Sequence, residues 1–181
     1  MDQRQPIDRI QRMGEQQFIA AFGGLYESSP WVAEQAWRER PYADVAQLGQ
    51  TMARIVKDAG CERQLALLRA HPALGERGPM SAFSAEEQSG AGLGVLAEEE
   101  LGRLADLNAE YKAQFGYPFI LAVRGKTPEE IEQTIRHRLE HAPQLEWRIA
   151  LAEVDAIAGY RLEDWCEALT DMDDIEEEGT G

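Results

Sequence analysis

Apolar residues recur at helical spacing through most of the chain, and prolines, glycines and capping residues separate the runs. Ser84-x-x-Glu87 has the capping-box pattern and predicts a helix that begins at Ser84. The other predicted helices cover residues 15–22, 31–38, 44–59, 62–70, 98–115, 127–141 and 143–169. The predicted fold class is therefore all-α, with about eight helices in a single domain over residues 1–170.

Three segments need a separate description. Residues 119–123 form a short apolar run after a proline, and no second run of this kind is present to pair with it, so we expect a buried extended segment there. Residues 171–181 are rich in Asp and Glu, which predicts a solvated, disordered tail. In the last helix, the predicted buried stripe consists of Leu145, Ile149, Ala152, Ala156 and Tyr160.

The net charge narrows the range of partners. At -15 over 181 residues, the chain repels nucleic acid and anionic membranes, so we expect neither as a partner. An anionic small molecule remains possible if a local positive pocket opposes the overall field. No apolar run has the length of a membrane span and the first residues lack a signal-peptide pattern, so we expect a cytoplasmic protein. Cys61 and Cys166 lack metal-type spacing and are expected to be buried thiols outside any disulfide.

The candidate chemistry centres on His71. The residue before a proline is pushed out of the helical region, so His71, which precedes Pro72, is expected at the exit of a helix. The predicted helix start at Ser84, with Glu87 in its first turn, follows about a dozen residues later. An imidazole, a carboxylate, a hydroxyl and a helix N-terminus at one place suit acid–base chemistry on a small anion.

An ordered set of motifs resembles the ureidoimidazoline decarboxylases of urate breakdown, from about residue 15 to 169. The motifs are His71-Pro72-x-Leu74-Gly75, Ser84-x-x-Glu87-Gln88, Ala91-Gly92-Leu93, Leu107-Asn108-x-x-Tyr111, Phe115-Gly116-Tyr117-Pro118-Phe119-Ile120, Val123-x-Gly125 and Arg161-Leu162. The resemblance implies an all-helical homodimer without a cofactor or metal. It also implies conversion of 2-oxo-4-hydroxy-4-carboxy-5-ureidoimidazoline to (S)-allantoin and carbon dioxide, a step of purine catabolism.

The resemblance also assigns residues. It implies that His71 is the catalytic acid–base and that Pro72 contacts the substrate. The residues implied to line the substrate are Ser84, Ala85, Glu86, Glu87 and Gln88, together with Phe119, Ile120, Leu121, Ala122 and Val123. We add two roles on physical grounds: Glu87 orients His71, and Arg161 binds the substrate carboxylate. The competing interpretations are that Glu87 only caps its helix and that Arg161 forms a surface salt bridge.

The chemistry is consistent with a protein that uses no cofactor. Loss of carbon dioxide leaves an electron pair on carbon, and an unsaturated bond in the substrate's own ring accepts it. The protein has to hold the carboxylate, stabilise the enolate and deliver a proton.

Some features depart from the family pattern. Ala73 stands where many relatives have an acidic residue, and the loop 76–80 has no strong match. Two other function classes are also considered. His137-x-x-Glu140-His141 matches the H-x-x-E-H signature of zinc hydrolases, although Pro143 ends the helix and no third ligand is evident. A non-catalytic helical interaction module would instead use an acidic face or the acidic tail as its binding surface.

Overall fold

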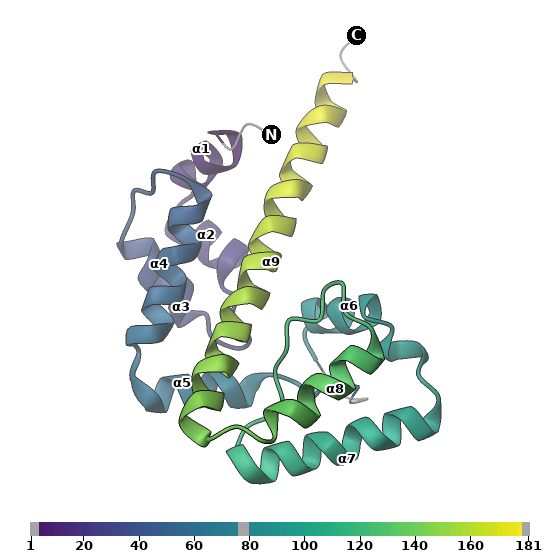
Figure 1. The fold of residues 1–181 in the computed structure, drawn as a ribbon. Coiled ribbons are helices and arrows are strands. Elements are labelled where there is room, and N and C mark those ends of the chain that lie inside the picture. Colours follow the sequence, from purple (N-terminus) through teal and green to yellow (C-terminus); the bar gives the residue numbers. More distant parts are fainter. Residues whose placement is uncertain (1–3, 76–79, 179–181) are drawn as a thin grey trace. The chain divides into compact units, whose positions relative to one another are not determined.

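The structure is a computed structural model that describes residues 4–75 and 80–178, with side chains through 169. Its described residues form α-helices and one short 3-10 helix, with no strand, which confirms the all-α prediction (Figure 1). In chain order the elements are α1 (Arg4–Arg12), α2 (Glu15–Phe22), α3 (Trp31–Arg38), α4 (Val45–Asp58), α5 (Gly60–Ala70), α6 (Ala82–Gly90), η1 (Leu93–Val95), α7 (Glu98–Phe115), α8 (Pro128–Arg138) and α9 (Pro143–Glu178). None of these helices is long and apolar enough to cross a membrane.

The chain divides into two compact units. The first consists of Met1–Gly60 and Ile157–Gly181, and the second of Cys61–Ala156, so that α9 contributes to both. In the first unit, α3 packs against α2 and α4. Its core includes Phe22, whose ring lies 4.8 Å from that of Phe18 and 4.7 Å from that of Trp165. Helix α1, which the sequence did not predict, precedes α2, and its Ile10 is fully buried.

The second unit is built around the non-helical segment 117–123. All seven of these residues are buried, as the sequence predicts, and α7 and α8 pack against each other nearby. The ring of Tyr111 on α7 lies 5.3 Å from that of Phe119. Gly116 ends α7 with φ +83°, a left-handed conformation that favours glycine. Thr127 caps α8 and forms a capping box with Glu130, so this helix begins where the sequence predicts.

The start of α6 corrects one prediction. The N-cap is Ser81, whose Oγ accepts a hydrogen bond from the backbone N–H of Ser84 at 3.2 Å. Ser84 is therefore inside the first turn, and the predicted capping box of Ser84 and Glu87 is wrong. Serines at 81 and 84 are both suitable N-cap residues, and the sequence pattern selected the second because a glutamate follows it three residues later.

The buried face of α9 corrects a second prediction. Leu145 is 40% exposed, and Ala152 and Ala156 are exposed as well. The residues that are buried instead are Glu146, Ala150, Val154, Ile157, Ala158, Arg161, Leu162 and Leu169. Two of these are charged, so a pattern of apolar residues alone selects the wrong face. The helix was also expected to end near Leu169, whereas its backbone continues to Glu178. The predicted disorder of the tail stays a prediction, and residues 179–181 lie outside the described residues.

The cysteine prediction holds only in part. Neither Cys61 nor Cys166 forms a disulfide, as expected. Cys61 is exposed, however, because it lies in the first turn of α5 on the solvent side. Cys166 is half-buried, and burial raises the pKa of its thiol to about 11, with nearby Glu163 and Glu167 adding to the effect.

Candidate active site around His71

His71 is buried directly after the last residue of α5, where its backbone N–H still bonds to the carbonyl of Leu68. Its Nδ1 lies 2.9 Å from the carbonyl oxygen of Leu67. A carbonyl oxygen can only accept, so Nδ1 carries the hydrogen, and the lone pair of the neutral ring is on Nε2. The end of the helix thus fixes the tautomer and makes Nε2 the atom that takes up or returns a proton.

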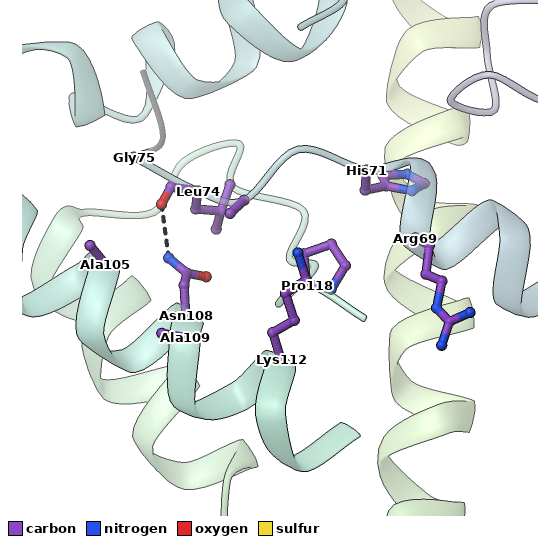
Figure 2. Close-up of a pocket in the computed structure, with 10 residues that line it drawn as sticks. Arg69, His71, Leu74, Gly75, Ala105, Asn108, Ala109, Lys112 and Pro118 are labelled. Carbon is purple, nitrogen blue, oxygen red and sulfur yellow. Dashed lines mark hydrogen bonds between the residues drawn. The ribbon is translucent and has the colours of Figure 1, made fainter. Parts of the chain in front are cut away.

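A cavity of about 270 Å³ opens beside His71 within the second unit (Figure 2). The residues that line it are Arg69, His71, Ala73, Leu74, Gly75, Ala105, Asn108, Ala109, Lys112 and Pro118. Arg69 and Lys112 are cationic, and none of the described lining residues is acidic. In a chain of net charge -15, this is the local positive pocket that an anionic ligand requires.

Two amide side chains hold the loop of residues 73–75, which forms one wall of the cavity. The Gln88 side chain on α6 accepts a hydrogen bond from the backbone N–H of Gly75 at 2.9 Å and donates to the carbonyl of Ala73 at 3.3 Å. From α7, Asn108 Nδ2 donates to the carbonyl of Leu74 at 2.9 Å. Gly75 has φ +76°, and a Cβ there would lie 2.8 Å from a methyl carbon of Leu104, so the position requires glycine.

The residues predicted from 84 to 88 differ in their surroundings. Ser84 is buried, and its hydroxyl accepts a hydrogen bond from the Ser81 hydroxyl at 3.0 Å. Ala85 and Glu86 are exposed, while Glu87 is half-buried. Because Ser81 caps the helix, the Glu87 carboxylate is not needed for a capping box, and that objection to its role beside His71 no longer applies. None of these side chains lines the described cavity, although Gln88 binds two of the cavity's loop residues.

The predicted segment 119–123 is fixed by charged side chains from two helices. The carbonyl of Ile120 accepts a hydrogen bond from Arg138 Nη1 at 2.7 Å, and the backbone N–H of Ala122 donates to the Glu153 carboxylate at 2.8 Å. These two backbone groups are therefore already bonded to protein side chains and are not available to a ligand. Pro118 lines the cavity, so the segment begins at its wall.

Arg138 belongs to a buried charged cluster with Glu146. Glu146 is fully buried and accepts hydrogen bonds from the Tyr111 hydroxyl and from Arg138 Nε, the latter at 2.7 Å. His141 Nδ1 lies 2.9 Å from the other Glu146 oxygen. Burial, together with the hydrogen bond to Glu146, raises the pKa of Tyr111 far above its usual value. The cluster stabilises the segment that the resemblance assigns to the substrate.

The same contacts bear on the zinc-hydrolase alternative. Helix α8 ends at Arg138, so His141 lies beyond it, and the two histidines do not share one helical face. His141 instead contacts Glu146, with its ring centroid 5.0 Å from that of His137. Among the side chains that the structure describes, in residues 6–75 and 80–169, no three His, Cys, Asp or Glu are grouped to hold a metal ion.

Arg161 lies in the first unit and is 2% exposed. Its Nη1 donates to the carbonyls of Gly24 and Leu25 at 3.2 and 3.3 Å and lies 3.3 Å from the Glu27 carboxylate. A surface salt bridge was the competing interpretation, and it is wrong because both charged side chains are buried. A buried arginine with a paired carboxylate is held in a fixed orientation, which suits a binding group as well as a structural one.

The fold and this cavity define a class: an all-helical protein with a tautomer-fixed histidine beside a positively charged pocket. The chain belongs to the OHCU decarboxylase family, whose model matches residues 11–163 and therefore extends through both units. A protein of Halalkalicoccus jeotgali named 2-oxo-4-hydroxy-4-carboxy-5-ureidoimidazoline decarboxylase is 41% identical over 161 residues, covering 89% of this chain and 92% of its own.

Solved structures agree with this family. A crystal structure of (S)-allantoin synthase matches with a TM-score of 0.73 and 30% identity, over 88% of this chain and 53% of the other. A crystal structure of OHCU decarboxylase in the presence of (S)-allantoin matches with a TM-score of 0.66 and 26% identity, over 83% and 97% of the two chains.

Proposed function

We propose that this protein is a carboxy-lyase that converts 2-oxo-4-hydroxy-4-carboxy-5-ureidoimidazoline to (S)-allantoin and carbon dioxide in urate degradation. Membership of the family and the names of its relatives support the reaction. The observation in this chain that carries it is the fixed tautomer of His71, a residue that also lines a cavity whose described charged side chains are Arg69 and Lys112.

The proposed reaction starts with cleavage of the bond between the ring carbon and its carboxylate. Carbon dioxide leaves, and the bonding electrons move into the adjacent C=N bond of the ring, whose nitrogen takes up a proton. The hydroxyl on the carbon that lost carbon dioxide then gives up its proton and becomes a ring carbonyl, while a proton is added to the neighbouring carbon that carries the ureido group. His71 manages that proton through Nε2, and Glu87 orients the imidazole. Protonation on one face gives a single enantiomer of allantoin.

The remaining assignments concern binding. In this proposal Pro72 and residues 84–88 and 119–123 surround the substrate, while Arg161 binds its carboxylate. The hydrogen bonds that segment 119–123 forms with Arg138 and Glu153 support the proposal because they hold the segment in one conformation. The Glu27 carboxylate restrains Arg161 in a similar way.

Replacing His71 tests the catalytic assignment. A positioned acid or base contributes about 10²–10⁴-fold, so His71→Ala should lower kcat by that factor. The matched control is His137→Ala, which removes an exposed imidazole from α8 and should leave kcat unchanged. Circular dichroism at 222 nm checks that both variants are folded. Full activity of folded His71→Ala protein contradicts the assignment.

The resemblance also predicts a homodimer in the cytoplasm, and we carry both forward as proposals. Light scattering coupled to gel filtration measures the first: a dimer of the 20.3 kDa chain has twice its mass. A monomer at micromolar concentration contradicts it.

A further inference from the structure

Asn108 has a buried oxygen that receives no hydrogen bond. The residue is 7% exposed, and its Nδ2 donates to the carbonyls of both Leu74 and Leu104, each at 2.9 Å. Both partners are acceptors, so the amide group is oriented with Oδ1 pointing away from them. Among the described residues no donor bonds to this Oδ1, and such an unsatisfied buried acceptor costs about 1–3 kcal/mol.

The position of this oxygen suggests why the cost is tolerated. Asn108 lines the cavity beside His71, and Figure 2 shows Oδ1 on the side of Pro118, opposite the bond to Leu74. Lys112 is one helical turn further along α7, on the same cavity wall. Arg69 lines the cavity from α5, where its Nε donates to the carbonyl of Gly116 at 3.0 Å. One acceptor and two cations therefore surround a space of about 270 Å³.

We propose that this cavity is a binding subsite for a small carboxylate that carries an N–H or O–H group close to its charge. Lys112 and Arg69 neutralise the carboxylate, and Asn108 Oδ1 accepts the hydrogen bond from the ligand. A ligand that brings both groups satisfies the buried oxygen, whereas a carboxylate without a donor leaves it unsatisfied. The subsite thus selects among carboxylates by their donor.

The natural ligand rests on the proposed function. A substrate with a ureido group and a carboxylate has this chemistry, and so has bicarbonate, which forms when the released carbon dioxide is hydrated. The first source makes Arg69 and Lys112, in place of Arg161, the groups that bind the substrate carboxylate, with Asn108 as a specificity-determining residue. The second source leaves the carboxylate to Arg161 and makes the cavity a site of product inhibition. The binding site itself does not depend on which of them occupies it.

A pair of isosteric probes tests the role of Asn108 without changing the protein. Oxamate and pyruvate are both small carboxylates, but oxamate has an amide NH₂ where pyruvate has a methyl group. Binding is measured by calorimetry and by the ring signals of the three histidines in nitrogen-correlated NMR, with His71 assigned from the His71→Ala variant. Oxamate should shift the His71 signals and bind about ten-fold more tightly than pyruvate, the effect of one hydrogen bond to a buried acceptor.

Charge is tested with matched lysine variants. Lys112→Met removes a cation from the cavity and should weaken oxamate binding about ten-fold. Lys57→Met removes an exposed lysine from α4 in the other unit, so it alters the net charge equally and should leave binding within two-fold. Both positions are exposed and helical, where methionine is well tolerated.

The outcomes separate the two proposals. Equal affinities for oxamate and pyruvate, or equal effects of the two lysine variants, overturn the subsite whether or not the protein makes allantoin. Selective oxamate binding in a protein that makes no allantoin supports the subsite and overturns the proposed function. In the active enzyme, a ten-fold higher KM for Lys112→Met identifies the substrate as the ligand, and a loss of bicarbonate inhibition identifies the product.

Discussion

The buried pair of Arg138 and Glu146 gives the sharpest prediction on stability. Glu146→Leu removes a fully buried carboxylate that accepts hydrogen bonds from Arg138 and Tyr111. Arg138, itself 3% exposed, then keeps its charge in the core, with the carbonyl of Ile120 as an uncharged partner. The reverse variant, Arg138→Met, leaves Glu146 charged and buried without its cation.

Breaking a buried ion pair from one side costs about 3–5 kcal/mol, because the remaining charge is desolvated and uncompensated. This is a large part of the roughly 5–15 kcal/mol that stabilises a folded domain. The double variant leaves no uncompensated charge and should cost only about 1–3 kcal/mol, from the unsatisfied Ile120 carbonyl and Tyr111 hydroxyl. The two single costs are therefore strongly non-additive.

Urea unfolding, followed by tryptophan fluorescence and by circular dichroism at 222 nm, measures these free energies. An ion pair on the surface of α8, the helix that carries Arg138, provides the control. Arg136 Nη2 lies 2.8 Å from the Glu132 carboxylate, and the two side chains are 55% and 28% exposed. At this exposed pair we make the same substitutions, Arg136→Met and Glu132→Leu. The cost of the double variant should differ from the sum of the two single costs by less than about 0.5 kcal/mol. Additive costs at Arg138 and Glu146, or single costs below about 1 kcal/mol, refute the reasoning.

Three further predictions concern other parts of the chain. Ser81→Ala should lower the free energy of unfolding by about 1 kcal/mol because it removes the N-cap of α6. Ser89→Ala, at an exposed position of the same helix, should cost little. If urea unfolding gave the larger loss for Ser89→Ala, the cap assignment would be contradicted. Burial, together with the nearby charge of Glu146, raises the pKa of Tyr117 to about 12 in the folded protein. The unfolded chain loses the same proton near the ordinary tyrosine pKa of about 10, so the free energy of unfolding should fall as the pH rises from about 10 to 12. Tyr117→Phe should make that fall shallower, and an unchanged slope would show that the hydroxyl does not contribute. Truncation after Leu169 should leave turnover and melting temperature unchanged, and a large loss of either would show that the acidic segment has a role.

The helices that the sequence predicts well have strong local signals at their ends. Asp44 caps α4, Thr127 and Pro128 start α8, and Gly116 ends α7, and in each case a side chain or φ angle enforces the boundary locally. The start of α6 is harder because two serines three residues apart both suit the N-cap position, and only the folded loop selects Ser81.

Charged residues in the core explain the larger error on α9. Glu146 and Arg161 occupy buried positions that a hydrophobic pattern assigns to solvent. Both are tolerated because residues far away in the sequence, such as Arg138 and Glu27, neutralise them. A single sequence does not reveal those partners, so the face of the helix was misassigned.

The candidate site shows the same limit. His71 was identified because the following proline places it at the end of a helix, and this position is confirmed. Asn108 and Lys112 were not identified as cavity residues, although Asn108 stands in one of the quoted motifs. Their spacing of four residues on α7 puts them on one helix face, but only the fold brings that face to the loop after α5.

The central claim is that this chain makes (S)-allantoin from the ureidoimidazoline. The most direct measurement is circular dichroism while the unstable substrate is generated from urate by urate oxidase and hydroxyisourate hydrolase, in chelator-treated buffer. The purified protein should speed the decay of the intermediate and leave a persistent signal of the (S) enantiomer. If folded protein leaves the decay unchanged and the signal fades to that of racemic allantoin, the claim is contradicted.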